Sequence, residues 1–180
     1  YCSGYLPAFH NTGKFLYRGF GAEHVKHPIF YGKPVENRRP RDSAQNMQVI
    51  FDQMLTDLKV KALRSNSIFV TSNRHVAEGY GVPFIIFPTN DTAYAWSTTH
   101  HDIVLYSTGS TANMLQDYEA YKNKPEDKEY ILQRFQATFD FKTYDLEEAM
   151  MKENQEIWFT GHYFAVLASL EPQLRKLLFH

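Results

Sequence analysis

The sequence is poor in cysteine, in long apolar runs and in net charge, and each shortage excludes a class of protein. Cys2 is the single cysteine among 180 residues, which excludes an internal disulfide and a zinc site built from several thiolates. The longest apolar run, from Val82 to Pro88, is too short to cross a bilayer as a helix, so no contact with a membrane is expected. Nineteen basic and twenty acidic residues give a formal net charge of −1. A nucleic-acid partner would therefore need a local basic patch.

Aromatic residues, in contrast, are plentiful, with twelve Tyr and fourteen Phe. Burial of so many rings can offset the entropy lost on folding, so the chain is not expected to be disordered. Its length corresponds to a single domain over residues 1–180. Because the chain begins at Tyr1 and not at Met, we expect a processed product or a domain excised from a longer chain.

The order of secondary-structure signals predicts an α+β fold. Apolar residues at the spacing of one helical face predict a helix over residues 44–62, with Ser43 as its cap. Residues 110–136 are predicted helical on both sides of a break at Asn123 to Pro125. The remaining predicted elements are strands at 14–20, 67–71, 83–88, 94–97, 103–106, 156–160 and 163–167, short helices at 74–79 and 144–152, and a loop at 30–43. Strands and helices are segregated, which favours α+β over a parallel βαβ array.

Three short segments carry side chains suited to chemistry. Arg18 and Gly19 end the first strand, where a planar guanidinium beside accessible backbone suits a phosphate. Taken alone, such an arginine is more often a solvated residue at the edge of a sheet. Glu156 opens an aromatic strand near the end of the chain, and its simplest interpretation is an edge glutamate that faces water.

The third segment lies between these two. Thr71, Ser72 and Asn73 end a strand and precede the short helix at 74–79, so their polar groups gather near a helix N-terminus. A helix cap by Ser72 or Asn73 is the simpler interpretation of this segment.

Together, an arginine after an early strand, Thr-Ser after a middle strand and a glutamate before a late strand resemble the Arg–Ser–Glu pattern of mono-ADP-ribosyltransferases, a toxin-like class that also occurs in phages. "LYRG" resembles the first motif of that class. "SIFVTSNRHVAEGYG" resembles its Ser-Thr-Ser strand, and "LEEAMMKENQEIWFTGHYFAVL" resembles the loop and strand with the catalytic glutamate. The resemblance covers residues 14–168.

The resemblance implies a split β-sandwich with a central NAD cleft and flanking helices. It implies transfer of ADP-ribose from NAD to a macromolecular acceptor, protein or nucleic acid, with release of nicotinamide. NAD would be a cosubstrate, with no metal required. The site of action would be the cytoplasm of a bacterial host or of a target cell.

The resemblance also assigns roles to individual residues. Glu156 would stabilise an oxocarbenium-like transition state, Arg18 would hold the pyrophosphate or the adjoining ribose, and the backbone of Gly19 would contact the nicotinamide amide. The ribose and the glutamate would be fixed by hydroxyl groups, and an aromatic ring would stack on nicotinamide. Thr71 and Ser72 are assigned to fix the ribose and the glutamate, with Asn73 beside them. Either Tyr80 or Phe84 is assigned to stack on nicotinamide, and packing in the core is the alternative role for both.

Acceptor recognition is assigned to Asn154 and to the basic residues Arg39 and Arg41 of the loop at 33–41. Asn154 can hydrogen-bond an acceptor but cannot serve as a base, so arginine side chains are not the first choice of target. Val70 stands where the Ser-Thr-Ser triplet has its first hydroxyl, so the usual partner of the glutamate is missing unless Thr71 or Asn73 replaces it.

Three alternatives to a transferase remain open. The first is an NAD glycohydrolase, the second a catalytically inactive NAD-binding module, and the third a domain whose motifs match by chance. A metal site is not expected from the histidine pairs, which are His100 with His101 and His24 with His27, because neither has the i, i+4 spacing of ligands on one helical face.

Overall fold

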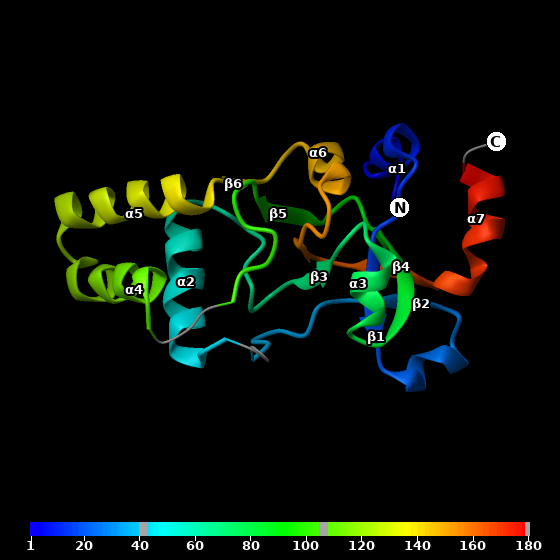
Figure 1. Cartoon of the computed structure of the whole chain (residues 1–180), viewed down its shortest axis with the longest axis horizontal. Coiled ribbons are helices and arrows are strands. Elements are labelled where there is room, and N and C mark those ends of the chain that lie inside the picture. Colours follow the sequence, from blue (N-terminus) through cyan, green and yellow to red (C-terminus); the bar gives the residue numbers. More distant parts are fainter. Residues whose placement is uncertain (40–42, 105–107, 179–180) are drawn as a thin grey trace.

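Two antiparallel sheets form the centre of the molecule (Figure 1). The computed structural model describes residues 1–39, 43–104 and 108–178. Sheet A has the order β1-β4-β8-β2 and sheet B the order β3-β7-β5-β6, and every pair of neighbouring strands is antiparallel. The strands are β1 (Tyr17–Phe20), β2 (Ile29–Gly32), β3 (Ile68–Val70), β4 (Val82–Pro88), β5 (Ala93–Ser97), β6 (Phe141–Lys142), β7 (Ile157–Thr160) and β8 (Tyr163–Leu167). The expected α+β class is confirmed.

Helices flank the two sheets. They are α1 (Leu6–Thr12), η1 (Ala22–Lys26), α2 (Gln45–Asp57), α3 (Arg74–Glu78), α4 (Ser110–Tyr121), α5 (Pro125–Phe139), α6 (Leu146–Met151), η2 (Ala168–Leu170) and α7 (Glu171–Leu178). Figure 1 shows α2, α4 and α5 gathered at one end of the molecule and α7 at the other. No helix within the described ranges is long and apolar enough to cross a membrane.

Strand β7 contributes to two hydrophobic cores. Ile157 and Phe159 belong to a core that also contains Phe84 and Ile85 of β4. Trp158 belongs to a second core, with Phe51 of α2 and the aromatic residues of α5. Since successive side chains of a strand point to opposite faces, one strand can serve both cores.

The two sheets join where β1 meets the end of β3. The amide of Tyr17 donates to the carbonyl of Thr71 at 2.7 Å, and the amide of Thr71 donates back to Tyr17 at 3.0 Å. This pair places the next residue of β1, Arg18, beside the end of β3. The guanidinium of Arg18 donates from Nη1 to the carbonyl of Phe69 at 2.9 Å.

Several sequence-based predictions about single elements are wrong. The residue at the N-cap of α2 is Ala44, without a side-chain cap, and not Ser43. The helix ends at Asp57, because the chain reverses at Lys59 with a φ of 62°. The predicted loop at 30–43 contains most of β2, an edge strand that pairs only with β8 among the described strands.

The predicted strand at 103–106 is not formed at Ile103 and Val104, which have no regular structure, and its other residues lie outside the described ones. The break at Asn123 to Pro125 is confirmed, since α5 begins at Pro125. Proline at the first position of a helix lacks only an amide that would be unpaired there anyway.

Candidate functional site

A cavity of about 280 Å³, just below the roughly 300–1,000 Å³ typical of small-molecule sites, lies where the two sheets join. It is lined from β1, from the end of β3, from α3 and the turn after it, and from the segment that precedes β7. The polar residues that line it are Arg18, Arg38, Ser43, Gln48, Arg64, Thr71, His101, Asp102, Asn154 and Glu156, with Tyr17, Gly19, Phe69 and Tyr80 among the others.

Arg18 projects from β1 into this cavity. Its Nη1 donates to the carbonyl of Phe69, and its guanidinium carbon lies 5.4 Å from the ring centroid of Phe20. Its Nε is buried and has no hydrogen-bond partner among the described residues. Burial and the neighbouring charge of Arg38 lower the pKa of Arg18 to about 10.

Two further arginines surround the ring of Phe69. The guanidinium carbon of Arg38 lies 4.2 Å from the ring centroid and that of Arg64 lies 4.9 Å from it. Within the described ranges, Nη1 of Arg38 and Nε of Arg64 are buried without a hydrogen-bond partner. Burial and the charge of Arg64 also lower the pKa of Arg38. We call Arg18, Arg38 and Arg64 the arginine cluster.

Glu156 forms an ion pair with the arginine cluster. Its side chain is 19% exposed, and its Oε1 lies 3.2 Å from Nη1 of Arg64. The indole Nε1 of Trp158 donates to the same oxygen at 2.6 Å. Burial raises the pKa of Glu156 to about 7, against the lowering effects of Arg64, of the Trp158 hydrogen bond and of Arg38, while Asp102 adds a smaller raising effect.

The cavity is suited to an anion. Three guanidinium groups face it, and the carboxylates that line it are those of Glu156 and Asp102. The guanidinium atoms without partners are donors that a phosphate oxygen can satisfy, and Arg is well matched to phosphate geometry. An anion bound there would also offset the mutual repulsion that lowers the pKa values of Arg18 and Arg38.

Thr71, Asn73 and Asn154 form a hydrogen-bonded chain at one side of the cavity. The Asn73 side chain accepts from the amide of His75 at 2.9 Å, so Asn73 is the N-cap of α3. Thr71 Oγ1 accepts from the amide of Asn73 at 3.2 Å. Asn73 Nδ2 donates to Asn154 Oδ1 at 2.7 Å. Asn73 thus caps a helix and also holds Asn154.

Gly19 lines the cavity at a point where the turn after α3 packs closely against β1. A Cβ at this position would lie 2.3 Å from the carbonyl oxygen of Ala77 and 2.7 Å from the amide nitrogen of Gly81. The glycine therefore allows the turn after α3 to pack against β1, which also brings Tyr80 to the cavity.

The structure brings most of the predicted site residues together. Arg18, Gly19, Thr71, Tyr80, Asn154 and Glu156 line one cavity, and Asn73 is bonded to it through Asn154. Ser72 is half-buried beside the cavity and is not among its lining residues.

Other predicted site residues lie elsewhere. Phe84 is fully buried in the core between the sheets, so it cannot stack on a ligand. Arg39 is exposed and is not among the lining residues, whereas its neighbour Arg38 is. Arg41 lies outside the described residues.

Four lining residues with charged or imidazole side chains were not predicted as site residues from the sequence, namely Arg38, Arg64, His101 and Asp102. Arg38 lies in the basic loop at 33–41, so the loop itself was the available signal. His101 belongs to a histidine pair whose pattern bears only on a metal site, and Asp102 follows it directly in the chain. In the described part of the chain, no three His, Cys, Asp or Glu side chains are grouped to hold a metal ion.

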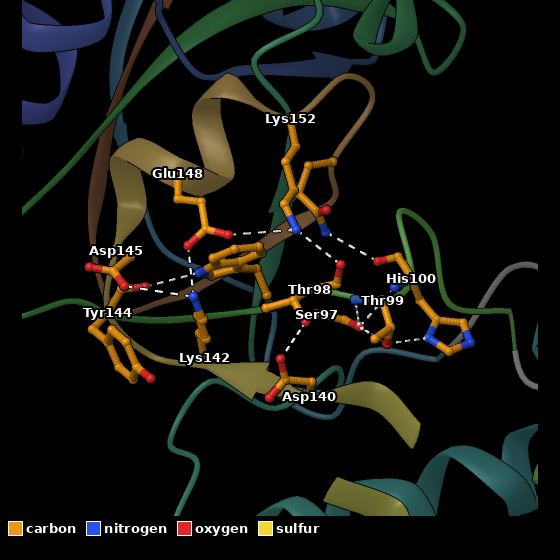
Figure 2. Close-up of polar contacts among 12 residues, drawn as sticks. Ser97, Thr98, Thr99, His100, Asp140, Lys142, Tyr144, Asp145, Glu148 and Lys152 are labelled. Atoms are coloured by element: carbon orange, nitrogen blue, oxygen red, sulfur yellow. Dashed lines mark hydrogen bonds and ion pairs between the residues drawn. The ribbon is translucent and has the colours of Figure 1, made fainter. Parts of the chain in front are cut away.

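A polar network steadies the segment that carries Glu156. Figure 2 shows Glu148 between Lys142 and Lys152, with Lys152 reaching to Thr98. The Lys152 ammonium donates to the carbonyl of Thr98 at 2.9 Å.

Two further hydrogen bonds join this segment to the loop at 98–102. Gln155 Nε2 donates to the carbonyl of His100 at 3.2 Å, and the amide of Glu156 donates to the carbonyl of His101 at 2.8 Å. The loop that brings His101 and Asp102 to the cavity is thereby tied to the backbone of Glu156.

Comparison with known proteins adds no relative: no protein-family model matches the chain, and no curated protein or solved structure matches it. A function for the chain is therefore inferred from the geometry of this cavity and from the sequence motifs.

Proposed function

We propose that the chain transfers ADP-ribose from NAD to a macromolecular acceptor and releases nicotinamide. The observation that carries this proposal is the convergence of Arg18, Thr71 and Glu156, from three distant parts of the sequence, on one cavity. Two antiparallel sheets that meet at this cavity are compatible with the split β-sandwich that the resemblance implies.

The donor set fits the diphosphate of NAD. The arginine cluster offers buried guanidinium nitrogens that have no partner among the described residues, and two negatively charged phosphates supply the acceptors they need. Arg18 would bind the diphosphate, and Tyr80, whose side chain is well exposed at the rim, would pack on the nicotinamide ring.

Glu156 would act on the ribose. The bond between C1′ of the ribose and the nicotinamide nitrogen breaks, its electron pair leaves with the nicotinamide, and positive charge develops on the sugar. The ionised carboxylate of Glu156 stabilises that charge until the acceptor nucleophile bonds to C1′ and releases its proton to the solvent. Since the pyridinium nitrogen becomes neutral on leaving, no general acid is required.

Radiolabelled NAD tests the proposal. Incubation with a cell lysate should put label on a polymer, whereas a glycohydrolase would release free ADP-ribose only. Glu156→Gln should lower the rate of nicotinamide release by about 10²–10³. Glu153→Gln, in the same segment but exposed and outside the cavity lining, is the matched control and should retain the native rate. A native chain that neither cleaves nor binds NAD would refute the proposal.

A further inference from the structure

Two side chains donate hydrogen bonds to the carboxylate of Glu156, and neither is among the site residues that the family resemblance assigns. In the motif, a hydroxyl at the position of Val70 would steady the glutamate. Val70 instead pairs with Ile157 across β3 and β7, and both side chains are buried in the core between the sheets. Because side chains alternate along a strand, Glu156 and Trp158 project to the face opposite Ile157. A side chain at position 70 therefore points away from Glu156.

Trp158 and Arg64 donate hydrogen bonds to Glu156 in place of that hydroxyl. Both donate to Oε1 of Glu156, at 2.6 Å from the indole and 3.2 Å from the guanidinium. Among the described residues, none donates a hydrogen bond to Oε2. Two hydrogen bonds thus fix Oε1, while the side chain of Glu156 still lines the cavity.

Both donors are themselves rigidly held. Trp158 is 1% exposed and packs against the aromatic rings of Phe51 and Phe141. The backbone amide of Arg64 donates to Oδ1 of Asp52 on α2 at 2.9 Å, and the next amide, of Ser65, donates to Oδ2 at 3.1 Å. The indole of Trp158 and the backbone of Arg64 are thus held in place, which limits the entropic cost of positioning Glu156.

We infer that Arg64 and Trp158 are the positioning residues of Glu156, which bind Oε1 and leave Oε2 directed at the ribose. This inference rests on the proposed function. Arg64 has a second effect, because its charge favours the ionised carboxylate against the cost of burial. The other charged groups that act on Glu156 are Arg38, which also favours ionisation, Asp102, which opposes it, and Arg18, whose own pKa is raised by Glu156.

The test combines three variants with a pH profile of NAD cleavage. Arg64→Gln keeps a donor and loses the charge, Arg64→Lys keeps the charge, and Trp158→Phe keeps the ring and loses the donor. We expect kcat to fall about ten- to a hundredfold in Arg64→Gln and Trp158→Phe, since displacement of a reacting group by about 1 Å costs on this scale. KM for NAD should stay within about threefold of native in Trp158→Phe, whereas Arg64→Gln also removes a member of the arginine cluster and should raise KM. The acid limb of the kcat profile should move to higher pH in Arg64→Gln and return toward native in Arg64→Lys.

Matched controls separate this result from damage to the fold. Trp96→Phe removes another buried indole hydrogen bond, to the carbonyl of Tyr144, and Arg134→Gln removes an exposed arginine of α5. Both should retain the native kcat and acid limb. A kcat within threefold of native in Arg64→Gln and Trp158→Phe, or an acid limb that Arg64→Gln does not move, would overturn the inference.

A carboxyl titration keeps the inference testable even without turnover. Carbon-13 NMR of protein labelled at glutamate, with the Glu156 signal assigned by its loss in Glu156→Gln, reports the pKa of this carboxyl directly. A pKa that rises in Arg64→Gln supports control of Glu156 by Arg64, and an unchanged pKa contradicts it. Absence of NAD cleavage by the native chain would instead refute the proposed function.

Discussion

Asn73 and Asn154, which are 81 residues apart in the sequence, are joined by a hydrogen bond of 2.7 Å from Nδ2 of the first to Oδ1 of the second. The direction of this bond follows from the helix cap. An amide of the backbone, that of His75, must donate to Oδ1 of Asn73, which leaves the amino group of Asn73 for Asn154. The amino group of Asn154 is then the part left to meet an acceptor molecule.

Asn73→Ser should separate the two tasks of this residue. A serine can still cap α3, so the free energy of unfolding should remain within about 1 kcal/mol of native. Its hydroxyl is too short to reach Asn154, so transfer of label to the acceptor should fall while hydrolysis of NAD continues. Assays of labelled polymer and of free nicotinamide measure the two activities. Equal losses of both would contradict a role for this bond in acceptor recognition.

Arg18→Lys should weaken the binding of NAD without unfolding the protein. Lysine keeps the charge but loses the planar fork, and the loss of a charged hydrogen bond costs about 1.5–3 kcal/mol, or a ten- to hundredfold rise in the Kd measured by calorimetry. Arg134→Lys, on the exposed surface of α5, is the matched control and should bind as the native protein does. An unchanged Kd in Arg18→Lys would remove this residue from the site.

Gly19→Ala should destabilise the fold. The new methyl group would lie 2.3 Å from the carbonyl of Ala77, so the turn after α3 must move, at a cost of about 1–3 kcal/mol. Gly79→Ala, where the nearest atom is a carbonyl oxygen at 3.3 Å and φ is −63°, should cost much less. Urea denaturation of both variants measures the difference. If Gly19→Ala and Gly79→Ala had equal free energies of unfolding, the backbone around Gly19 would be able to move aside at little cost, which would contradict the prediction.

Glu156 should make stability depend on pH. Burial raises its pKa from 4.5 to about 7, so the folded state binds the proton more tightly than the unfolded state. Stability is therefore lost as pH rises from about 4.5 to 7, by at most about 3 kcal/mol from this group.

Comparison with Glu156→Gln isolates the effect. The substitution also has a cost that is the same at every pH, and this cost does not affect how the free energy of unfolding changes with pH. Between pH 4.5 and 8, the native protein should therefore lose stability relative to the variant. Urea denaturation across this range checks it. Parallel stability curves for the two proteins would contradict the raised pKa.

Predictions from the sequence succeeded where the cause is local. The boundary at Pro125 was visible because proline begins a helix readily and cannot continue one. Strand β8 was predicted with its observed limits because Gly161, with a φ of 98°, separates two apolar runs. The segments of Arg18, Thr71 and Glu156 were identified because polar residues follow or precede apolar strands.

Predictions failed where contacts with residues far away in the sequence determine burial or strand pairing. Arg64 gave no signal, because its burial depends on Asp52, which holds its backbone from α2. Phe84 was indistinguishable from Tyr80 as a stacking residue, since only the pairing of β4 between β1 and β8 buries it. Strand β2 was read as loop because Gly32 and Pro34 are typical of turns, yet the glycine packs against the ring of Tyr163.

Arg18 lies on β1 of sheet A and Glu156 immediately precedes β7 of sheet B, and the pair of hydrogen bonds between Tyr17 and Thr71 joins the two sheets. The separation of Arg18 and Glu156 therefore depends on a seam that need not touch a ligand. A slight splaying of this seam would alter which molecules fit while every contacting side chain stayed the same. Backbone packing behind the cavity therefore limits the size of the molecule that can bind there.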